Sequence, residues 1–217
     1  TGTDCQILSI NLKPGARLES ESGAMVFMSP DVRPFIYKSN VVRTTAECGS
    51  CTRSCAGETC CKVIYTNQGA KDAYVGLSSD FPAKIVPVDL GSWGDSNLIS
   101  KAGAYLSNVG DVEVTVNCDC GVTGCCIRGM GCIRQSSKGS GTVFLEAGGT
   151  VLTRTLGAGE KIVVDSDSVV GFQDTVQLGY QMNGGPCTWC FGGEGCCNLT
   201  MSGPGNIMIQ SMSREKF

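Results

Sequence analysis

Histidine is absent from this sequence of 217 residues, and aromatic residues make up only 6% of it. Without an imidazole the chain cannot build a Ser–His–Asp triad or a Cys–His nucleophile pair. A metal site would have to use cysteine thiolates or carboxylates, because no histidine ligand is available. We therefore expect a protein that is not an enzyme and that carries no cofactor.

Basic clusters and long apolar runs are also lacking. The formal net charge is −3 and the isoelectric point is about 5.0. Nucleic-acid binding needs clustered Lys and Arg, so we expect no nucleic-acid partner. No apolar stretch approaches the roughly 18 residues of a membrane-spanning helix, so we expect membrane association to be peripheral at most.

Helical periodicity is absent too, and this favours an all-β fold. No segment keeps apolar residues at positions i, i+3, i+4 and i+7 over ten or more residues. Short alternating segments separated by Gly, Asn or Ser turns dominate instead, and the chain contains 30 glycines. A closed barrel, sandwich or prism is the expected architecture, because closure removes exposed strand edges.

Three imperfect repeats organise the chain. A glycine turn followed by two short strands begins after each of Leu12, Leu90 and Leu156. Each repeat later carries an adjacent cysteine pair, a turn and another strand. The pairs are Cys60-Cys61, Cys125-Cys126 and Cys196-Cys197. We predict one domain over residues 1–217, with repeats at approximately 1–78, 79–147 and 148–217 and pseudo-threefold symmetry.

Fifteen cysteines are the most distinctive feature of the composition. Fourteen of them form three clusters: Cys48, Cys51, Cys55, Cys60, Cys61; Cys118, Cys120, Cys125, Cys126, Cys132; and Cys187, Cys190, Cys196, Cys197. We predict disulfides within the clusters, each closing a loop of about ten residues and contributing roughly 2–3 kcal/mol. Because fifteen is odd, one thiol is left over. Cys5 stands apart, either as a buried small residue or as a free or intermolecular thiol.

Metal binding by thiolates is the alternative for these clusters. Cys48 and Cys51, like Cys187 and Cys190, have the Cys-x2-Cys spacing of zinc knuckles, and iron–sulfur ligation is chemically feasible. The second cluster lacks that spacing, and vicinal cysteines on an extended strand point to opposite faces. These two observations favour disulfides, and no metal site is predicted.

Several other motifs are predicted to have structural roles. Asn198-Leu-Thr200 is a glycosylation sequon. Trp93, Trp189 and Tyr105 would suit either a carbohydrate-binding surface or internal packing, and packing is favoured. We expect turns at the carboxylates Asp165, Asp167, Asp174, Glu58, Glu160 and Glu194. We also expect hairpin turns at Gly139-Ser-Gly141 and Gly203-Pro-Gly205, since neither glycine motif opens a helix as a phosphate loop does.

Five motifs in order resemble the AIM24 family of TRAP-like proteins. They are Leu12-Lys-Pro-Gly15 with Ser22-Gly-Ala-Met-Val-Phe-Met28, Gly103-Ala-Tyr-Leu106, Leu156-Gly-Ala-Gly-Glu160 with Val163-Val-Asp165, Phe191-Gly-Gly-Glu-Gly195, and Gly203-Pro-Gly-Asn-Ile-Met-Ile-Gln-Ser211. The resemblance implies a three-repeat, double-stranded β-helix-like or β-prism-like fold and no catalytic residues. It also implies a link to membrane organisation and assembly in mitochondria. Cys196-Cys197 occupies a place where the family usually has an apolar or aromatic pair.

Together these observations predict a disulfide-rich structural or assembly protein. We expect a homo-oligomer or a part of a larger protein assembly, located outside the cell or in another oxidising compartment such as an organelle lumen. A carbohydrate-binding or surface-ligand module and a metal-thiolate protein are the two alternatives.

Overall fold

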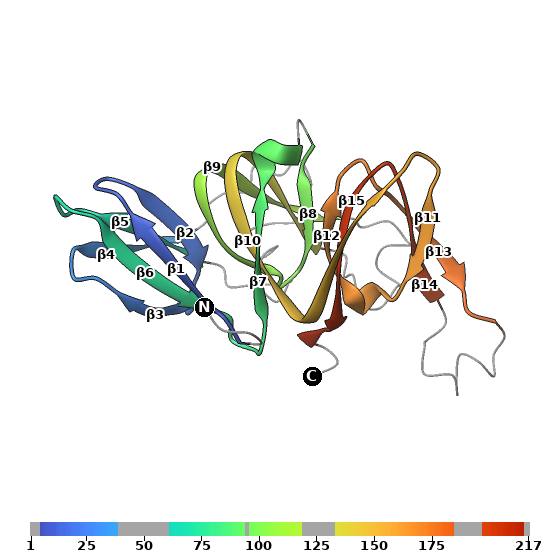
Figure 1. Ribbon diagram of the computed structural model, residues 1–217, viewed down its shortest axis with the longest axis horizontal. Coiled ribbons are helices and arrows are strands. Elements are labelled where there is room, and N and C mark those ends of the chain that lie inside the picture. Colours follow the sequence, from blue (N-terminus) through green and yellow to red (C-terminus); the bar gives the residue numbers. More distant parts are fainter. Residues whose placement is uncertain (1–4, 39–60, 94–95, 119–132, 185–196, 215–217) are drawn as a thin grey trace.

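A computed structural model describes residues 5–38, 61–93, 96–118, 133–184 and 197–214 of the chain (Figure 1). All regular structure in these residues is β-strand except for two short 3-10 helices, so the all-β prediction is confirmed. No helix in these five ranges has the length and apolar character needed to span a membrane.

The strands follow the short alternating segments of the sequence. In chain order they are β1 (Ile7–Leu12), β2 (Arg17–Glu21), β3 (Met25–Met28), β4 (Val32–Lys38), β5 (Cys61–Asn67), β6 (Ala73–Ser78), β7 (Lys84–Asp89), β8 (Leu98–Lys101), β9 (Tyr105–Cys118), β10 (Ile133–Leu156), β11 (Lys161–Val164), β12 (Val169–Gln173), β13 (Gln177–Met182), β14 (Cys197–Ser202) and β15 (Gly205–Met212). The 3-10 helices are η1 (Leu90–Trp93) and η2 (Ser166–Ser168).

The strands form three antiparallel sheets. A three-stranded sheet with the order β1-β6-β3 lies at one end of the molecule, and another with the order β11-β14-β13 lies at the opposite end (Figure 1). Between them a nine-stranded sheet runs β15-β12-β8-β10-β9-β2-β5-β4, with β7 paired to β10. Because β15 also pairs with β10, the path β10-β8-β12-β15 closes on itself.

The 24-residue strand β10 is the centre of the large sheet. It pairs with β9, β8, β7 and β15 along its length. Gly139 and Gly141 lie inside this strand, so the hairpin predicted there is wrong. They are needed for close approach to β9, since a Cβ on Gly139 would lie 2.2 Å from the Asp111 carbonyl oxygen. The register shifts between Gly148 and Val151, where β10 passes from β7 to β15.

Three hydrophobic clusters fill the interior of the part of the chain that the structure describes. The first is built mainly from β1, β2, β5 and β6, the second from β7 to β10, and the third from the end of β10 to β15. Leu12, Leu90 and Leu156, the residues that open the three predicted repeats, are buried in the first, second and third cluster. Burial of these leucines fixes the start of each glycine turn against its own cluster.

The same irregularity occurs in three strand pairs. On β3 the residue Val26 is extra relative to β6, on β9 Leu106 is extra relative to β10, and on β12 Val170 is extra relative to β15. Each is a β-bulge, in which two residues of one strand oppose one residue of its partner. A bulge redirects its side chain away from the regular alternation of the strand.

The close approach of β9 and β10 gives a testable prediction. Gly139→Ala should lower the free energy of unfolding by about 3 kcal/mol, because the new Cβ meets the Asp111 carbonyl and the φ of Gly139 is +122°. Gly15→Ala is the matched control: its φ is +76°, but no atom lies within 4 Å of the added Cβ. It should cost only about 1 kcal/mol. Urea unfolding of both variants under identical redox conditions measures the difference, and equal losses would contradict the steric explanation.

Candidate functional site

Each cysteine cluster belongs to the connection of an antiparallel strand pair. In β4–β5 the last described pair is Lys38 with Cys61, in β9–β10 it is Cys118 with Ile133, and in β13–β14 it is Met182 with Cys197. We call each of these strand pairs a stem. The remaining clustered cysteines lie in the segments that connect the two strands of each stem, which are 39–60, 119–132 and 185–196. These remaining cysteines lie outside the described residues: Cys48, Cys51, Cys55, Cys60, Cys120, Cys125, Cys126, Cys132, Cys187, Cys190 and Cys196.

Three clustered cysteines are placed by the strands themselves. Cys61 opens β5, Cys118 closes β9 and Cys197 opens β14, where its side chain is half-buried. Paired antiparallel residues have Cα atoms about 4.5–5.5 Å apart, which falls in the range that a disulfide spans. The stems thus hold the two ends of each cysteine segment side by side, and the residues opposite Cys61, Cys118 and Cys197 are Lys38, Ile133 and Met182. The disulfides themselves stay a prediction.

Cys5 lies just before β1 and is exposed. It forms no disulfide in the described part of the chain. The interpretation of this residue as a buried small hydrophobe is therefore wrong. An exposed thiol near a chain end is accessible to reagents and to a second molecule.

The aromatic side chains take structural roles. Tyr105 is fully buried in the second hydrophobic cluster, and its hydroxyl accepts a hydrogen bond of 2.6 Å from the Asn108 side-chain amide. Trp93 is partly buried against the same cluster. Packing is thus confirmed for both residues, and a carbohydrate surface that includes Tyr105 is excluded. Trp189 lies outside the described residues.

The sequon lies in the central strand of the end sheet β11-β14-β13. Asn198 is half-buried and pairs with Gln181 of β13, while Thr200 is buried. A substrate asparagine must be presented on an accessible backbone, so modification would have to precede formation of this sheet. Glycosylation of Asn198 stays a prediction.

The carboxylates in the third repeat stabilise turns, as predicted. Asp165 caps η2 by accepting a hydrogen bond of 3.1 Å from the Asp167 backbone N–H. Asp174 accepts a hydrogen bond of 2.8 Å from the Asn97 side-chain amide. Glu58 and Glu194 lie outside the described residues.

Glu160 also has the predicted turn role. Its carboxylate accepts hydrogen bonds from the Gly157 backbone N–H at 2.9 Å and from Arg154 at 2.6 Å. The Gly157 bond, followed by the Arg154 bond, lowers the pKa of Glu160 below its ordinary value. The later motif Gly203-Pro-Gly205 connects β14 and β15, which belong to different sheets. It is a turn between sheets, so its prediction as a hairpin is wrong.

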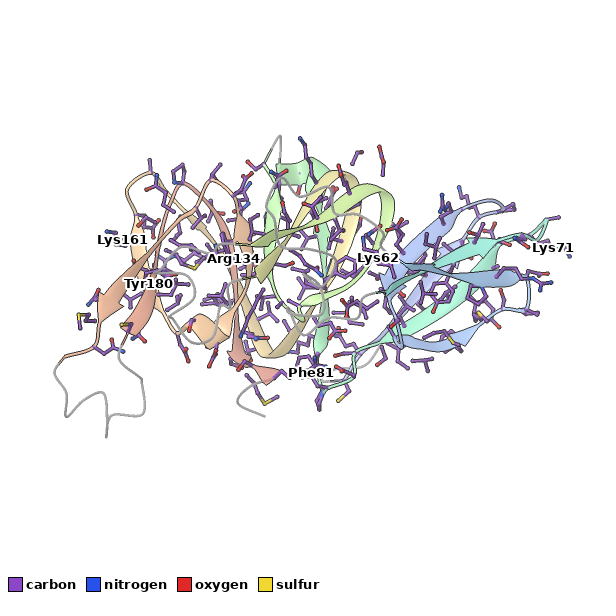
Figure 2. All side chains as sticks on the ribbon, turned by 180° about the vertical axis from the view of Figure 1, so that it is seen from behind. Lys62, Lys71, Phe81, Arg134, Lys161 and Tyr180 are labelled. Carbon is purple, nitrogen blue, oxygen red and sulfur yellow. The ribbon has the colours of Figure 1, made fainter. Side chains whose placement is uncertain are left out.

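A band of buried polar residues on β8, β9 and β10 was not predicted. Lys101 lies opposite Arg134 in the β8–β10 register, and its ammonium group is 3.6 Å from an Asp167 carboxylate oxygen. Ser100, next to Lys101, and Ser137, three residues after Arg134, are fully buried. Figure 2 shows Arg134 near the middle of the molecule. The consecutive polar residues of Gln135-Ser-Ser137 inside a long strand were the available signal, since a strand with two buried faces is expected to be apolar.

A second polar group lies within the nine-stranded sheet, where β5 and β2 come near β9. Lys62 on β5 lies 3.6 Å from a Glu19 carboxylate oxygen on β2, and its ammonium is 5.9 Å from the centre of the Tyr105 ring. Figure 2 places Lys62 where these strands meet the central part of the molecule. Within the described ranges no three His, Cys, Asp or Glu residues form a group that could hold a metal ion.

Glu146 on β10 is a buried carboxyl group. Its side chain accepts a hydrogen bond of 2.7 Å from the Ser79 hydroxyl, and the residue is only 8% exposed. Burial, opposed by the Ser79 hydrogen bond, raises the pKa of Glu146 from 4.5 to about 7. The folded protein thus holds a proton at Glu146 that the unfolded chain has already released near pH 6.

This raised pKa predicts a pH-dependent stability. Above pH 4.5 the unfolded state binds fewer protons than the folded state, so stability falls as the pH rises and levels off above about 7. The full effect is about 3 kcal/mol. Glu146→Gln should flatten the dependence of the unfolding free energy between pH 4.5 and 7. Asp72→Asn, which replaces an exposed carboxylate, is the control and should leave the slope intact.

The chain is a multi-sheet β protein in which three antiparallel strand pairs each lead into a connection that contains a cysteine cluster. A family model described as "Mitochondrial biogenesis AIM24" matches residues 1–212, so the chain belongs to the AIM24 family. The crystal structure of protein SPYM3_0169 from Streptococcus pyogenes is similar, with a TM-score of 0.74 and 22% sequence identity over 100% of this chain and 93% of that chain. At this identity the likeness shows the fold alone. The comparison with curated proteins gave no match.

Proposed function

We propose that this AIM24-family protein is a non-enzymatic scaffold. Its chain forms three similar β units, each with a cysteine-stapled hairpin, and it works by assembling with other protein chains. The TRAP-like, double-stranded β-helix-like arrangement of three repeats is part of this proposal. So is its location in an oxidising environment, where disulfides persist.

The strand pairings support the three units. Each unit contains two three-stranded arrangements: β1-β6-β3 with β2-β5-β4 in the first, β7-β10-β9 with β8-β10-β9 in the second, and β10-β15-β12 with β11-β14-β13 in the third. The bulges at Val26, Leu106 and Val170 fall at the same place in the three units. The proposed boundary between residues 147 and 148 lies just before the register shift in β10, which falls between Gly148 and Val151.

One observation carries the scaffold proposal: the cysteine segments occur at the same topological position in every unit. They join β4 to β5, the second half of β9 to the first half of β10, and β13 to β14. An active site occupies one position in a chain, whereas a reinforcement of a repeated framework is expected once per repeat. Three equivalent stapled hairpins therefore suit a durable structural part better than a catalyst.

The oxidation state of the cysteines tests this proposal. Alkylation of the native protein without reductant should modify Cys5, which is exposed, and leave most of the clustered cysteines unmodified. After reduction in denaturant all fifteen should be modified. Intact mass spectrometry before and after reduction counts both populations, and metal analysis of the same sample provides the control. Fifteen reactive thiols without reductant would reject the stapled scaffold, and stoichiometric zinc or iron would favour a metal-thiolate protein in its place.

A further inference from the structure

The connection between β6 and β7, residues 79–83, is held in place by parts of the chain that are far apart in the sequence. It contains no helix or strand, and it leads from the first proposed unit into the second. Gln6, just before β1, contacts its far end. The Gln6 backbone N–H donates to the Ala83 carbonyl at 3.2 Å, and the Gln6 side-chain oxygen accepts from the Ile85 N–H at 2.8 Å.

The inner side of this connection is bonded to Glu146 of β10. The Ser79 hydroxyl donates to the Glu146 carboxyl group at 2.7 Å, and it accepts a hydrogen bond of 3.3 Å from the Phe81 backbone N–H. The hydroxyl thus links the carboxyl group to the backbone turn of the connection. The Phe81 ring also lies near β10, since a Cβ on Gly148 would be 3.4 Å from it.

The outer side of the connection is clamped by the residues that follow β15. Ser213 is buried, and the Arg214 guanidinium donates a hydrogen bond to the Asp80 carboxylate. The same guanidinium lies 5.3 Å from the centre of the Phe81 ring, and Figure 2 shows Phe81 at the edge of the molecule. Arg214 and Asp80 are both exposed, so their ion pair is weak by itself. These contacts of the C-terminal residues therefore depend on the position of the connection.

The Glu146 carboxyl group has no cation beside it. In the described part of the chain the Ser79 hydroxyl is its hydrogen-bond partner. Lys84 on β7 is one position away from the residue paired with Glu146, so it lies on the other face of the sheet, and Lys101 lies beside Asp167. The remaining titratable residues on the surrounding elements are Cys5, Asp80, Asp89, Tyr105 and Arg214. An ionised Glu146 would be a buried charge held by one hydroxyl group.

Ionisation of Glu146 is therefore coupled to the position of the connection. Removing a carboxylate from water is unfavourable, and one neutral hydroxyl does not replace its hydration. Movement of residues 79–83 away from β10 admits water and returns the carboxyl group to its ordinary pKa of 4.5. In the closed arrangement burial, opposed by the Ser79 hydrogen bond, raises the pKa of Glu146 to about 7. The closed arrangement binds the proton more tightly than the open one, so acid favours it.

We propose that residues 79–83 form an acid-stabilised latch controlled by Glu146. At pH 5 the connection stays against β10 and Arg214 stays on Asp80 and Phe81. As the pH rises toward 7 the connection opens more often, and Arg214 loses both contacts together. The latch links the joint between the first two units to the end of the third, so pH acts on both places. This inference goes beyond the proposed scaffold role and does not depend on the state of the cysteines.

Amide hydrogen exchange of the native chain between pH 5 and 7.5 tests the latch. Rates are corrected for the intrinsic pH dependence of each amide, which leaves the frequency of opening. Protection of residues 79–85 should fall at least about tenfold between pH 5 and 7 and then level off. Protection of residues 212–214 should fall with it. The edge strand β13, at the end of the molecule away from β6, should not change (Figure 1).

Three variants separate the contributions. Glu146→Gln cannot ionise but keeps an oxygen that accepts the Ser79 hydrogen bond, so residues 79–85 should keep their acid-level protection up to pH 7. Asp72→Asn removes an exposed carboxylate and should behave like the parent. Arg214→Ala should lower the protection of residues 212–214 at every pH while leaving the pH dependence of residues 79–85 in place. Circular dichroism confirms that each variant is folded.

Several results would overturn the latch. Protection of residues 79–85 that is constant with pH, or a pH dependence that persists in folded Glu146→Gln, excludes control by this carboxyl group. A fall confined to residues 79–85, with residues 212–214 unaffected, excludes the link to the C-terminal residues. If residues 79–85 exchange no faster than the buried strand β12 at any pH, opening is global and the latch is wrong. In that case the predicted pH dependence of the unfolding free energy would still stand.

Discussion

The whole architecture depends on continuous backbone pairing along β10. This one strand supplies hydrogen-bonding edges to β9 along its first half, to β8 and β7 in succession on its other side, and to β15 after the shift at Gly148. The second and third hydrophobic clusters therefore share the strand β10. They cannot separate without breaking the hydrogen bonds that β10 makes before and after the shift at Gly148. The glycines at 139 and 141 let β9 approach closely enough for the ladder to remain unbroken.

Much of this fold was predictable because its signals are local. Short segments of the sequence were enough to predict three features. They are the buried leucines before the glycine turns, the strands after the cysteine pairs and the absence of helical periodicity. The two hairpin predictions are wrong because glycine alone does not show which strand lies beside it. Glycine occurs both in tight turns and where two strands approach closely. These two uses can be distinguished only when the partner strand is known, and that strand lies elsewhere in the sequence. Gly139 shows the second use and Gly203 a turn between different sheets.

The partners of the buried polar residues could not be predicted from the sequence for a related reason. Lys101 and Arg134 read as ordinary solvent-facing positions of strands, yet the pairing of β8 with β10 places them opposite each other, with Asp167 from a third segment beside Lys101. Glu146 likewise owes its raised pKa to burial between strands that the sequence does not show to be neighbours. The cysteine clusters were visible at once, and the structure adds what spacing could not: all three connect paired antiparallel strands.

The paired stems have a consequence for how this framework can change in evolution. The segment between Lys38 and Cys61 has 22 residues and the segment between Cys118 and Ile133 has 14, yet both begin and end on strands that are already paired. For a chain held at both ends, this difference in length alters the closure entropy by only about 0.4 kcal/mol. Insertions and deletions that keep the cysteines at these three places are therefore nearly neutral for the β framework, which leaves the segment lengths free to diverge between related proteins.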